Sequence, residues 1–299
     1  NGSLLMIKDY LSLFRLPQWI KNLFVFVPLL FAQKLFDPDY LVVSLAGFFI
    51  FSFSSSIIYT INDLVDIEAD RAHPKKKNRP LASGKISKNG AIIAALFLSA
   101  LVIVSLSYFN MYFIICVLSF ILMNIVYSYY LKHVVLLDVF SIASGFMLRV
   151  IGGALIINVE ISSWLILTTL FISLFLGVMK RHSELVRFKN SDNPETRKVL
   201  AFYSTDFTTQ LATISASAVI ICYALYTVAE RTVTVFGTEN LIYTTPIVVF
   251  GIFRYMFLVY MNNQGENTTK VMLTDKAMIL TVIIYALVTT FIIYRASVI

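Results

Sequence analysis

Charged residues are scarce in this sequence. Of its 299 residues, 14% are charged and 58% are hydrophobic, and the mean hydropathy is +0.80. A soluble globular domain carries about 25% charged residues, so the composition excludes that class and predicts an integral membrane protein. Neither a soluble domain nor a low-complexity tract is recognisable between the apolar runs.

Cysteine is also rare. Cys116 and Cys222 fall inside apolar runs and lack the spacing of metal ligands, so we expect both to be small apolar packing residues. A cleavable signal peptide is not expected, because the first apolar run is long, contains Pro28 and lacks a small-residue cleavage site. The first three residues, Asn1-Gly2-Ser3, resemble a cloning remnant.

Long apolar runs are abundant instead. They predict an all-α fold: a polytopic membrane bundle of nine transmembrane helices around a cytoplasm-facing polar cavity, with residues 1–299 forming a single catalytic domain. Asn110 alone separates the third run from the fourth, so that boundary depends on length. The nine runs are 18–35, 40–62, 91–109, 111–130, 136–157, 163–180, 208–229, 241–261 and 277–295.

Basic residues are distributed unevenly among the connecting loops. If the amino terminus lies inside, 19 of the 24 Lys and Arg residues lie on the cytoplasmic side, as the positive-inside rule requires. Topology therefore explains the net charge of +7, and we expect no nucleic-acid partner. Arg149 and Arg254 lie within predicted spans, and an intramembrane arginine must face a partner or a wet cavity.

The end of the second run carries the most informative pattern, Asn62-Asp63-x-x-Asp66-x-x-x-Asp70. If the helix continues, these oxygen ligands project from one face over about two turns. Neighbouring carboxylates repel one another unless a cation lies between them, and Mg²⁺ favours a few carboxylates together with substrate phosphate oxygens. We expect Asn62, Asp66 and Asp70 to be catalytic metal ligands, helped by Asp63. The alternative is a solvated helix end whose acids pair with neighbouring bases.

The loop that follows, residues 72–84, places four bases within five residues. Beside an acidic metal site, such bases suit a polyphosphate, because the metal binds one set of oxygens and arginine binds another bidentately. Topology and attraction to lipid headgroups explain most of the lysines equally well. Arg79, fixed beside Pro80, is the base that we expect to bind phosphate.

Two further polar clusters end apolar runs on the same side. Residues 127–133 include Tyr127 and Lys132, and residues 177–188 include Lys180, Arg181 and Glu184. Lys180 and Glu184 are four apart, so one interpretation is a plain helical salt bridge of ~0.3 kcal/mol. The other makes Glu184 a metal ligand and the bases phosphate ligands. The expected phosphate-binding residues are Arg79, Lys180, Arg181, Lys21, Lys132, Tyr59 and Tyr127, and loops 63–90 and 181–206 would cap the site.

These motifs resemble those of the UbiA superfamily of intramembrane prenyltransferases. The resemblance covers essentially the whole chain and rests on the pattern from Asn62 to Asp70, Arg79-Pro80-Leu81 and Tyr127-Ser128-x-x-Leu131-Lys132. It implies nine helices and a Mg²⁺-diphosphate site at the cytoplasmic face. The family's second aspartate-rich motif is missing, because Lys180-Arg181-His182-Ser183-Glu184 stands in its place.

That departure resembles one branch, the decaprenyl-phosphate phosphoribosyltransferases. The resemblance implies a Mg²⁺-dependent membrane glycosyltransferase that moves 5-phosphoribose from phosphoribosyl diphosphate (PRPP) to a polyprenyl phosphate and releases diphosphate. The implied setting is cell wall precursor synthesis at a bacterial or archaeal inner membrane. The active site would face the cytoplasm, and the resemblance is compatible with an oligomer. The motifs are Trp19-x-Lys21-Asn22, the run from Asp66 to Pro74, Leu131-Lys132-His133, Ser144-Gly145-Phe146, Lys180-Arg181-x-x-Glu184-Leu185, Arg197-Lys198 and Leu273-Thr274-Asp275-Lys276.

Two other functions stay open at this point. A UbiA-type enzyme could move a polyprenyl group from its diphosphate to an aromatic or other acceptor. A transporter or channel would use intramembrane charges as an ion path, but it predicts polar residues spread across the bilayer, whereas here they gather at one face. The extra bases at Lys180 and Arg181 favour phosphoribosyl transfer, because that reaction brings more phosphates to the site.

Overall fold

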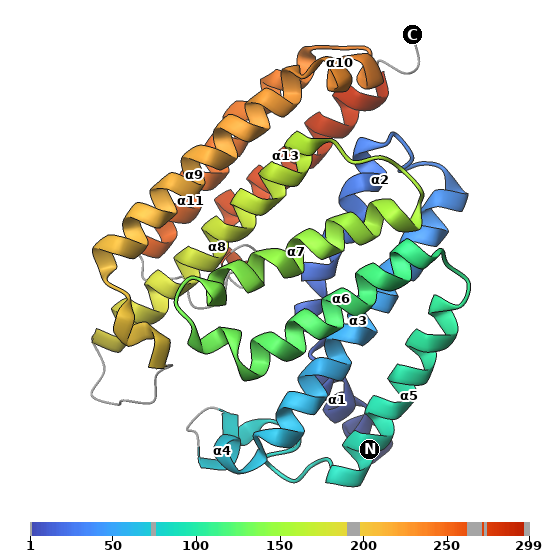
Figure 1. Cartoon of the computed structure of the whole chain (residues 1–299), viewed down its shortest axis with the longest axis vertical. Coiled ribbons are helices and arrows are strands. Elements are labelled where there is room, and N and C mark those ends of the chain that lie inside the picture. Colours follow the sequence, from blue (N-terminus) through green and yellow to red (C-terminus); the bar gives the residue numbers. More distant parts are fainter. Residues whose placement is uncertain (1, 73–75, 190–197, 262–270, 272–273, 296–299) are drawn as a thin grey trace.

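The computed structural model describes residues 2–72, 76–189, 198–261, 271 and 274–295. Helices joined by turns make up these ranges, and no strand occurs in them (Figure 1). Parts of both predicted cap loops, at 73–75 and 190–197, lie outside the described residues, as do Arg197 and Leu273 of the motifs. The prediction of an all-α fold is confirmed.

Eight helices in the described ranges are long and apolar enough to cross a membrane. Their outer faces are apolar: α5 buries Ala91, Ala95, Leu98 and Val102, a stripe at helical spacing, and exposes large side chains such as Phe97 between them. The protein is therefore an integral membrane protein. The eight are α3 (Pro38–Val65), α5 (Lys88–Leu106), α6 (Met111–Tyr129), α7 (Leu137–Ile156), α8 (Ser163–Lys189), α9 (Thr205–Val228), α11 (Thr245–Tyr260) with the 3-10 turn before it, and α13 (Lys276–Arg295).

The first predicted span, 18–35, is not one continuous α-helix. It forms a 3-10 helix, η1 (Leu16–Phe26), followed by the short α2 (Val27–Phe31). In a 3-10 helix side chains three apart eclipse one another. Trp19 and Asn22 therefore share one line, from which their side chains donate hydrogen bonds to Ser56 and Ser52 of α3 at 3.0 and 2.9 Å. These polar contacts explain why the segment keeps the tighter winding.

The helices follow one another around the bundle. Starting from α5, each helix packs against the next in the order α3, α6, α7, α8 and α9, and α11 with α13 closes the far side (Figure 1). The 3-10 helix η1 packs between α3 and α7. The shorter elements are α1 (Gly2–Leu13), α4 (Ile67–Ala72), η2 (Lys76–Asn78), η3 (Leu131–His133), η4 (Lys198–Phe202) and α10 (Glu230–Phe236).

Two polar residues, Asn110 and Asp275, explain where helices α6 and α13 begin, which the lengths of the apolar runs did not. Asn110 is the N-cap of α6, since its side chain accepts from the backbone amide of Phe113 at 2.9 Å, which supplies the missing turn signal between α5 and α6. Arg254 forms an ion pair with Asp275 at 2.7 Å, and the Asp275 carboxylate also accepts from the Met278 amide and caps α13. Of the two environments expected for Arg254, a partner or a wet cavity, the structure shows a partner.

Close contact between η1 and α7 depends on glycine. A Cβ atom on Gly153 would lie 2.1 Å from the carbonyl oxygen of Val25, which is backbone and unable to move aside. We therefore expect Gly153→Ala to push η1 off α7 and to destabilise the protein by about 1–3 kcal/mol. Thermal unfolding in detergent measures this change.

The matched control is Gly251→Ala on α11. A Cβ there would meet the Thr281 methyl group at 3.5 Å, which is ordinary van der Waals contact. We expect its melting temperature to equal that of the parent. Equal melting temperatures for the Gly153 and Gly251 variants would contradict the close packing of η1 on α7.

Candidate active site

The acidic pattern does not lie on one continuous helix. α3 ends at Val65, Asp66 leaves the helical conformation with ψ 12°, and α4 begins at Ile67. Ile67 is 3% exposed and packs into an apolar cluster with Leu13 and Leu81, and burying it turns the chain here. The expectation that the helix continues through the pattern was wrong, and α4 instead places Asp70 where it shares a partner with Asp63 of α3.

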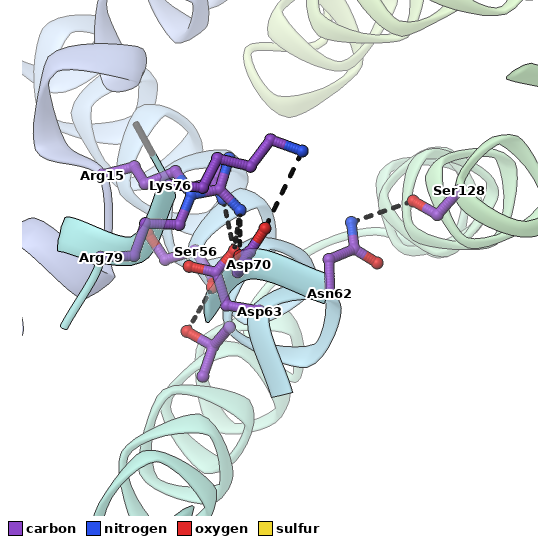
Figure 2. A network of polar contacts seen from close by, with 9 residues as sticks. Arg15, Ser56, Asn62, Asp63, Asp70, Lys76, Arg79 and Ser128 are labelled. Atoms are coloured by element: carbon purple, nitrogen blue, oxygen red, sulfur yellow. Dashed lines mark hydrogen bonds and ion pairs between the residues drawn. The ribbon is translucent and has the colours of Figure 1, made fainter. Parts of the chain in front are cut away.

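Two of the acids are buried and share one arginine. Asp63 and Asp70 are 3% and 2% exposed. Nη1 of Arg79 donates to Oδ1 of Asp63 at 3.0 Å and to Oδ2 of Asp70 at 2.6 Å, as Figure 2 shows. Lys76 lies 3.8 Å from the other oxygen of Asp70. For Asp63 and Asp70, the alternative stated from the sequence, in which the acids pair with neighbouring bases, therefore describes the contacts that the structure shows.

Arg15 adds a third cation that sequence reasoning missed. It bridges α1 and η1 in the left-handed region, with φ 52°, and its Nη2 donates to Oδ1 of Asp63 at 2.5 Å. Its guanidinium also lies over the ring of Tyr59, 4.6 Å from the centroid. A positive φ at a non-glycine residue is strained, and this strain aims the side chain at the acids. No local pattern indicates this contact, because Arg15 lies 48 residues from Asp63 along the chain.

The remaining residues of the pattern point elsewhere. The side-chain amide of Asn62 donates to Oγ of Ser128 on α6 at 3.0 Å (Figure 2). Asp66 is exposed, and across the described ranges its carboxylate has no hydrogen bond or ion pair. The structure thus brings Asp63 and Asp70 together and leaves Asn62 and Asp66 beside them.

A second buried cluster centres on Arg181 of α8. Its side chain is fully buried, and its Nε lies 2.6 Å from Oδ2 of Asp138, the first-turn acid of α7. The guanidinium also pairs with Glu184 and donates to the hydroxyl of Tyr127 at 3.2 Å. Arg181, Glu184 and Tyr127, three of the predicted site residues, therefore contact one another. Asp138 was not among the residues that the sequence predicted for the site.

Tyr203, just after η4, completes this cluster. Its hydroxyl donates to Oδ1 of Asp138 at 2.8 Å and accepts from the amide of Leu136 at 2.8 Å. Burial and the neighbouring carboxylate raise the pKa of Tyr203 well above its ordinary value. The hydroxyl therefore stays protonated as a donor at neutral pH and holds the Asp138 carboxylate toward Arg181.

The two clusters meet on α6. Tyr127 belongs to the Arg181 cluster, and its neighbour Ser128 accepts from Asn62 at the end of α3. Lys180 lies 4.0 Å from Glu184. Lys21 on η1 lies within electrostatic range of Lys180 and Arg15. Lys132 of η3 is half-buried and has no hydrogen bond or ion pair with any described residue. One end of the bundle thus carries nearly all of the predicted site residues.

Residues 22–283 match the model of the UbiA prenyltransferase family. The chain belongs to this family. Membership of the UbiA prenyltransferase family, with eight candidate spans in the described ranges, makes the protein a membrane transferase. The family resemblance drawn from the motifs is confirmed.

Two relatives of this UbiA family member carry the same name. A decaprenyl-phosphate phosphoribosyltransferase of Mycolicibacterium smegmatis is 33% identical over 225 residues, 74% of this chain and 70% of that protein. One of Corynebacterium glutamicum is 34% identical over 217 residues, 71% of this chain and 65% of that protein. The chain thus spans about two thirds of the length of these relatives, and the resemblance to this branch is confirmed.

A solved structure shows the same fold. A UbiA homologue from Archaeoglobus fulgidus, bound to DMAPP and Mg²⁺, superposes with a TM-score of 0.70 at 20% identity. The alignment covers 97% of this chain and 100% of that one. At this identity the similarity establishes the UbiA fold, and the bound Mg²⁺ belongs to the homologue.

The residues at the end of α3 fit such a metal by their chemistry. Asp63 and Asp70 present one oxygen each within 3.0 Å of a single nitrogen of Arg79, so two buried carboxylates already converge on one cationic position. Within the described ranges no three Asp, Glu, His or Cys side chains gather closely enough to hold a metal alone. Mg²⁺ is usually bound through one or two carboxylates plus substrate phosphates, so the oxygen donors fit a metal that arrives with a phosphate substrate.

Proposed function

We propose that this UbiA family member transfers 5-phosphoribose from PRPP to a polyprenyl phosphate and releases diphosphate. The observation that carries the proposal is the excess of bases over acids at one end of the bundle. Arg15, Lys76 and Arg79 surround Asp63 and Asp70. Lys180 and Arg181 add two more beside Asp138 and Glu184, where a prenyltransferase of this family has a second aspartate-rich motif. With Lys21 and Lys132, seven bases stand beside the five acids Asp63, Asp66, Asp70, Asp138 and Glu184. The names of the relatives support the same reaction.

The topology that we propose has nine spans. η1 and α2 together rise roughly 30 Å, since a 3-10 helix rises about 2.0 Å and an α-helix 1.5 Å per residue, and this length crosses the hydrocarbon layer. The segment is apolar. With the amino terminus inside, the ends of α3, α6 and α8 that carry the site face the cytoplasm, in a single catalytic domain with loops 63–90 and 181–206 as its cap.

Asn62, Asp66 and Asp70 would hold Mg²⁺ through their side-chain oxygens, with Asp63 and Glu184 as further ligands. When bound, the ion neutralises the leaving diphosphate. Asp63 and Asp70 hold Arg79 in place, so its guanidinium reaches diphosphate oxygens without first losing conformational freedom. Lys180 adds a flexible positive charge, while Arg181 keeps Glu184 oriented.

The bond changes require no strong base. The bond from C1 of the ribose to the diphosphate oxygen breaks, and its electron pair leaves with diphosphate. A phosphate oxygen of the acceptor, already anionic, forms the new bond to C1. The chain therefore has to bind, orient and neutralise phosphates, which suits a site made of arginine, lysine and carboxylate side chains.

The same fold supports a second function. The Archaeoglobus fulgidus homologue binds DMAPP and Mg²⁺, so transfer of a polyprenyl group from its diphosphate to another acceptor is the alternative. Incubation of the purified protein with Mg²⁺, a polyprenyl phosphate and labelled PRPP separates the two reactions. We expect a labelled lipid that forms only in the presence of the metal. Phosphoribosyl transfer would be rejected if the lipid fraction stayed unlabelled while the protein transferred a polyprenyl group from a polyprenyl diphosphate.

Arg79 provides a test of phosphate binding. Arg79→Lys keeps the positive charge but loses the planar fork, in which Nη1 is held by both Asp63 and Asp70 and the other nitrogens can bind phosphate oxygens. We expect the KM for PRPP to rise about tenfold or more, since one charge-assisted bidentate contact is lost. The control is Lys77→Gln in the exposed η2 turn, which should leave the KM unchanged. Equal KM values for both variants would remove Arg79 from the donor site.

A further inference from the structure

One cation lies deep in the bundle, away from the acids. Arg149 of α7 is 7% exposed. Its Nε donates a hydrogen bond to the side chain of Asn22 at 2.6 Å, and Asn22 in turn donates to Ser52 of α3. Arg149 therefore lies at about the same depth in the bundle as Ser52. Ser52 precedes Asp63 by about three turns, roughly 16 Å along the helix. Arg149 therefore lies well inside the bundle relative to the acids at the end of α3.

The contacts of Arg149 are neutral. Besides Asn22, its guanidinium donates to the carbonyl oxygen of Gly145 at 2.7 Å and lies over the rings of Phe120 and Phe146, at 4.5 and 5.6 Å from the centroids. In the described part of the chain no carboxylate pairs with it. These contacts orient the guanidinium, but they leave its charge uncompensated.

Lys21 places a second charge of the same sign nearby. It is half-buried on η1, directly before Asn22, and forms no hydrogen bond or ion pair with the residues that the structure describes. Asn22, the next residue along η1, accepts a hydrogen bond from Arg149, and the charges of Lys180, Arg149 and Arg15 that act on Lys21 are all positive. Two like charges in an apolar bundle repel each other and are costly to bury. Packing alone would be satisfied by a neutral side chain at either position.

We propose that Lys21 and Arg149 form an inner anion site for a phosphate monoester, distinct from the acids at the end of α3. Arg149 offers a planar fork and Lys21 a movable point charge, which together match a monoester dianion. The inference rests on the proposed function: with diphosphate held at the α3 end, the two remaining phosphates of the reaction are both monoesters. One is the 5-phosphate of PRPP, and the other is the head of the polyprenyl phosphate.

Binding measured by fluorescence tests this site without turnover. Trp19 lies two residues before Lys21 and bonds to Ser56, and Trp164 is the only other tryptophan. In a Trp164→Phe background, Trp19 reports titrations with ribose 5-phosphate, which carries only the donor monoester, and with a short polyprenyl monophosphate, which carries only the acceptor monoester. We expect the parent to bind both.

Lys21→Gln and Arg149→Gln should each weaken one of the two ligands by about tenfold or more, and the weakened ligand identifies the source of the phosphate. Arg149→Lys should retain part of the affinity. Lys34→Gln, which removes a half-buried lysine stacked on Tyr40, should bind like the parent. If Arg149→Gln fails to fold, Lys21→Gln decides, because it removes no described hydrogen bond.

Parent-like affinity of Lys21→Gln for both ligands, or a parent that binds neither, would overturn the inner site. The outcome is separable from the proposed function. A parent without phosphoribosyl transfer whose Lys21→Gln variant still loses monoester affinity keeps the inner site and rejects the function. A parent that transfers phosphoribose while Lys21→Gln binds normally keeps the function and rejects the inner site.

Discussion

Asp66→Asn should reduce transfer by roughly 10³-fold, a loss of about 4 kcal/mol in transition-state stabilisation. The amide keeps the size of the side chain but removes the negative charge that a divalent ion needs. The melting temperature should not change, since the exposed Asp66 carboxylate pairs with no described residue. Initial rates with labelled PRPP and thermal unfolding in the same detergent measure both quantities.

Glu68→Gln is the matched control for Asp66→Asn. Glu68 is an exposed acid on the same α4 helix, paired with Arg71 at 3.1 Å on the surface, and exposed pairs contribute little. We expect parent-like transfer from this variant. Full turnover by Asp66→Asn would remove Asp66 from the metal ligands, and equal losses in both variants would point to surface charge instead.

Arg181→Met should destabilise the protein by about 3–5 kcal/mol, because it leaves the Asp138 carboxylate buried without its cation. Asp138 is fully buried, and among the described residues its carboxylate would retain only the Tyr203 hydroxyl as a hydrogen-bond donor. The unfolding free energy in mixed detergent micelles measures the effect.

Two further variants make the Arg181 result specific. Arg187→Met replaces an exposed arginine of the same helix α8 and should be nearly neutral. Asp138→Asn combined with Arg181→Met removes both charges and should recover part of the lost stability. A double variant no more stable than Arg181→Met alone would show that the ion pair is not the source of the loss.

The sequence predicted the helical bundle well because apolar length is a strong signal. Runs near 20 residues have few alternatives to a membrane helix, and eight of the nine expected spans occur as long helices in the described ranges. The first run misled because length and composition do not distinguish an α-helix from a 3-10 helix. The winding of η1 follows from tertiary hydrogen bonds, such as that of Trp19 to Ser56, which no local pattern encodes.

The sequence predicted which kinds of residue form the site better than it predicted which of them are in contact. The sequence placed Asp63, Asp70 and Arg79 together because they are close along the chain, and they are in contact. It missed Arg15, which reaches Asp63 only because η1 folds back on α3. It also gave Arg181 a phosphate-binding role without its buried partner Asp138. Whether Arg181 meets phosphate stays a prediction.

A structure of the protein with PRPP and Mn²⁺ decides whether a divalent ion binds at the end of α3, because manganese gives an anomalous signal at the metal position. We expect an anomalous peak at the end of α3, with the ion coordinated by carboxylate oxygens of Asp66 and Asp70 and by diphosphate oxygens, and with Arg79 bound to the diphosphate. Bound PRPP with no anomalous peak there, and with Asp63 and Asp70 still paired only to Arg15, Lys76 and Arg79, would contradict it.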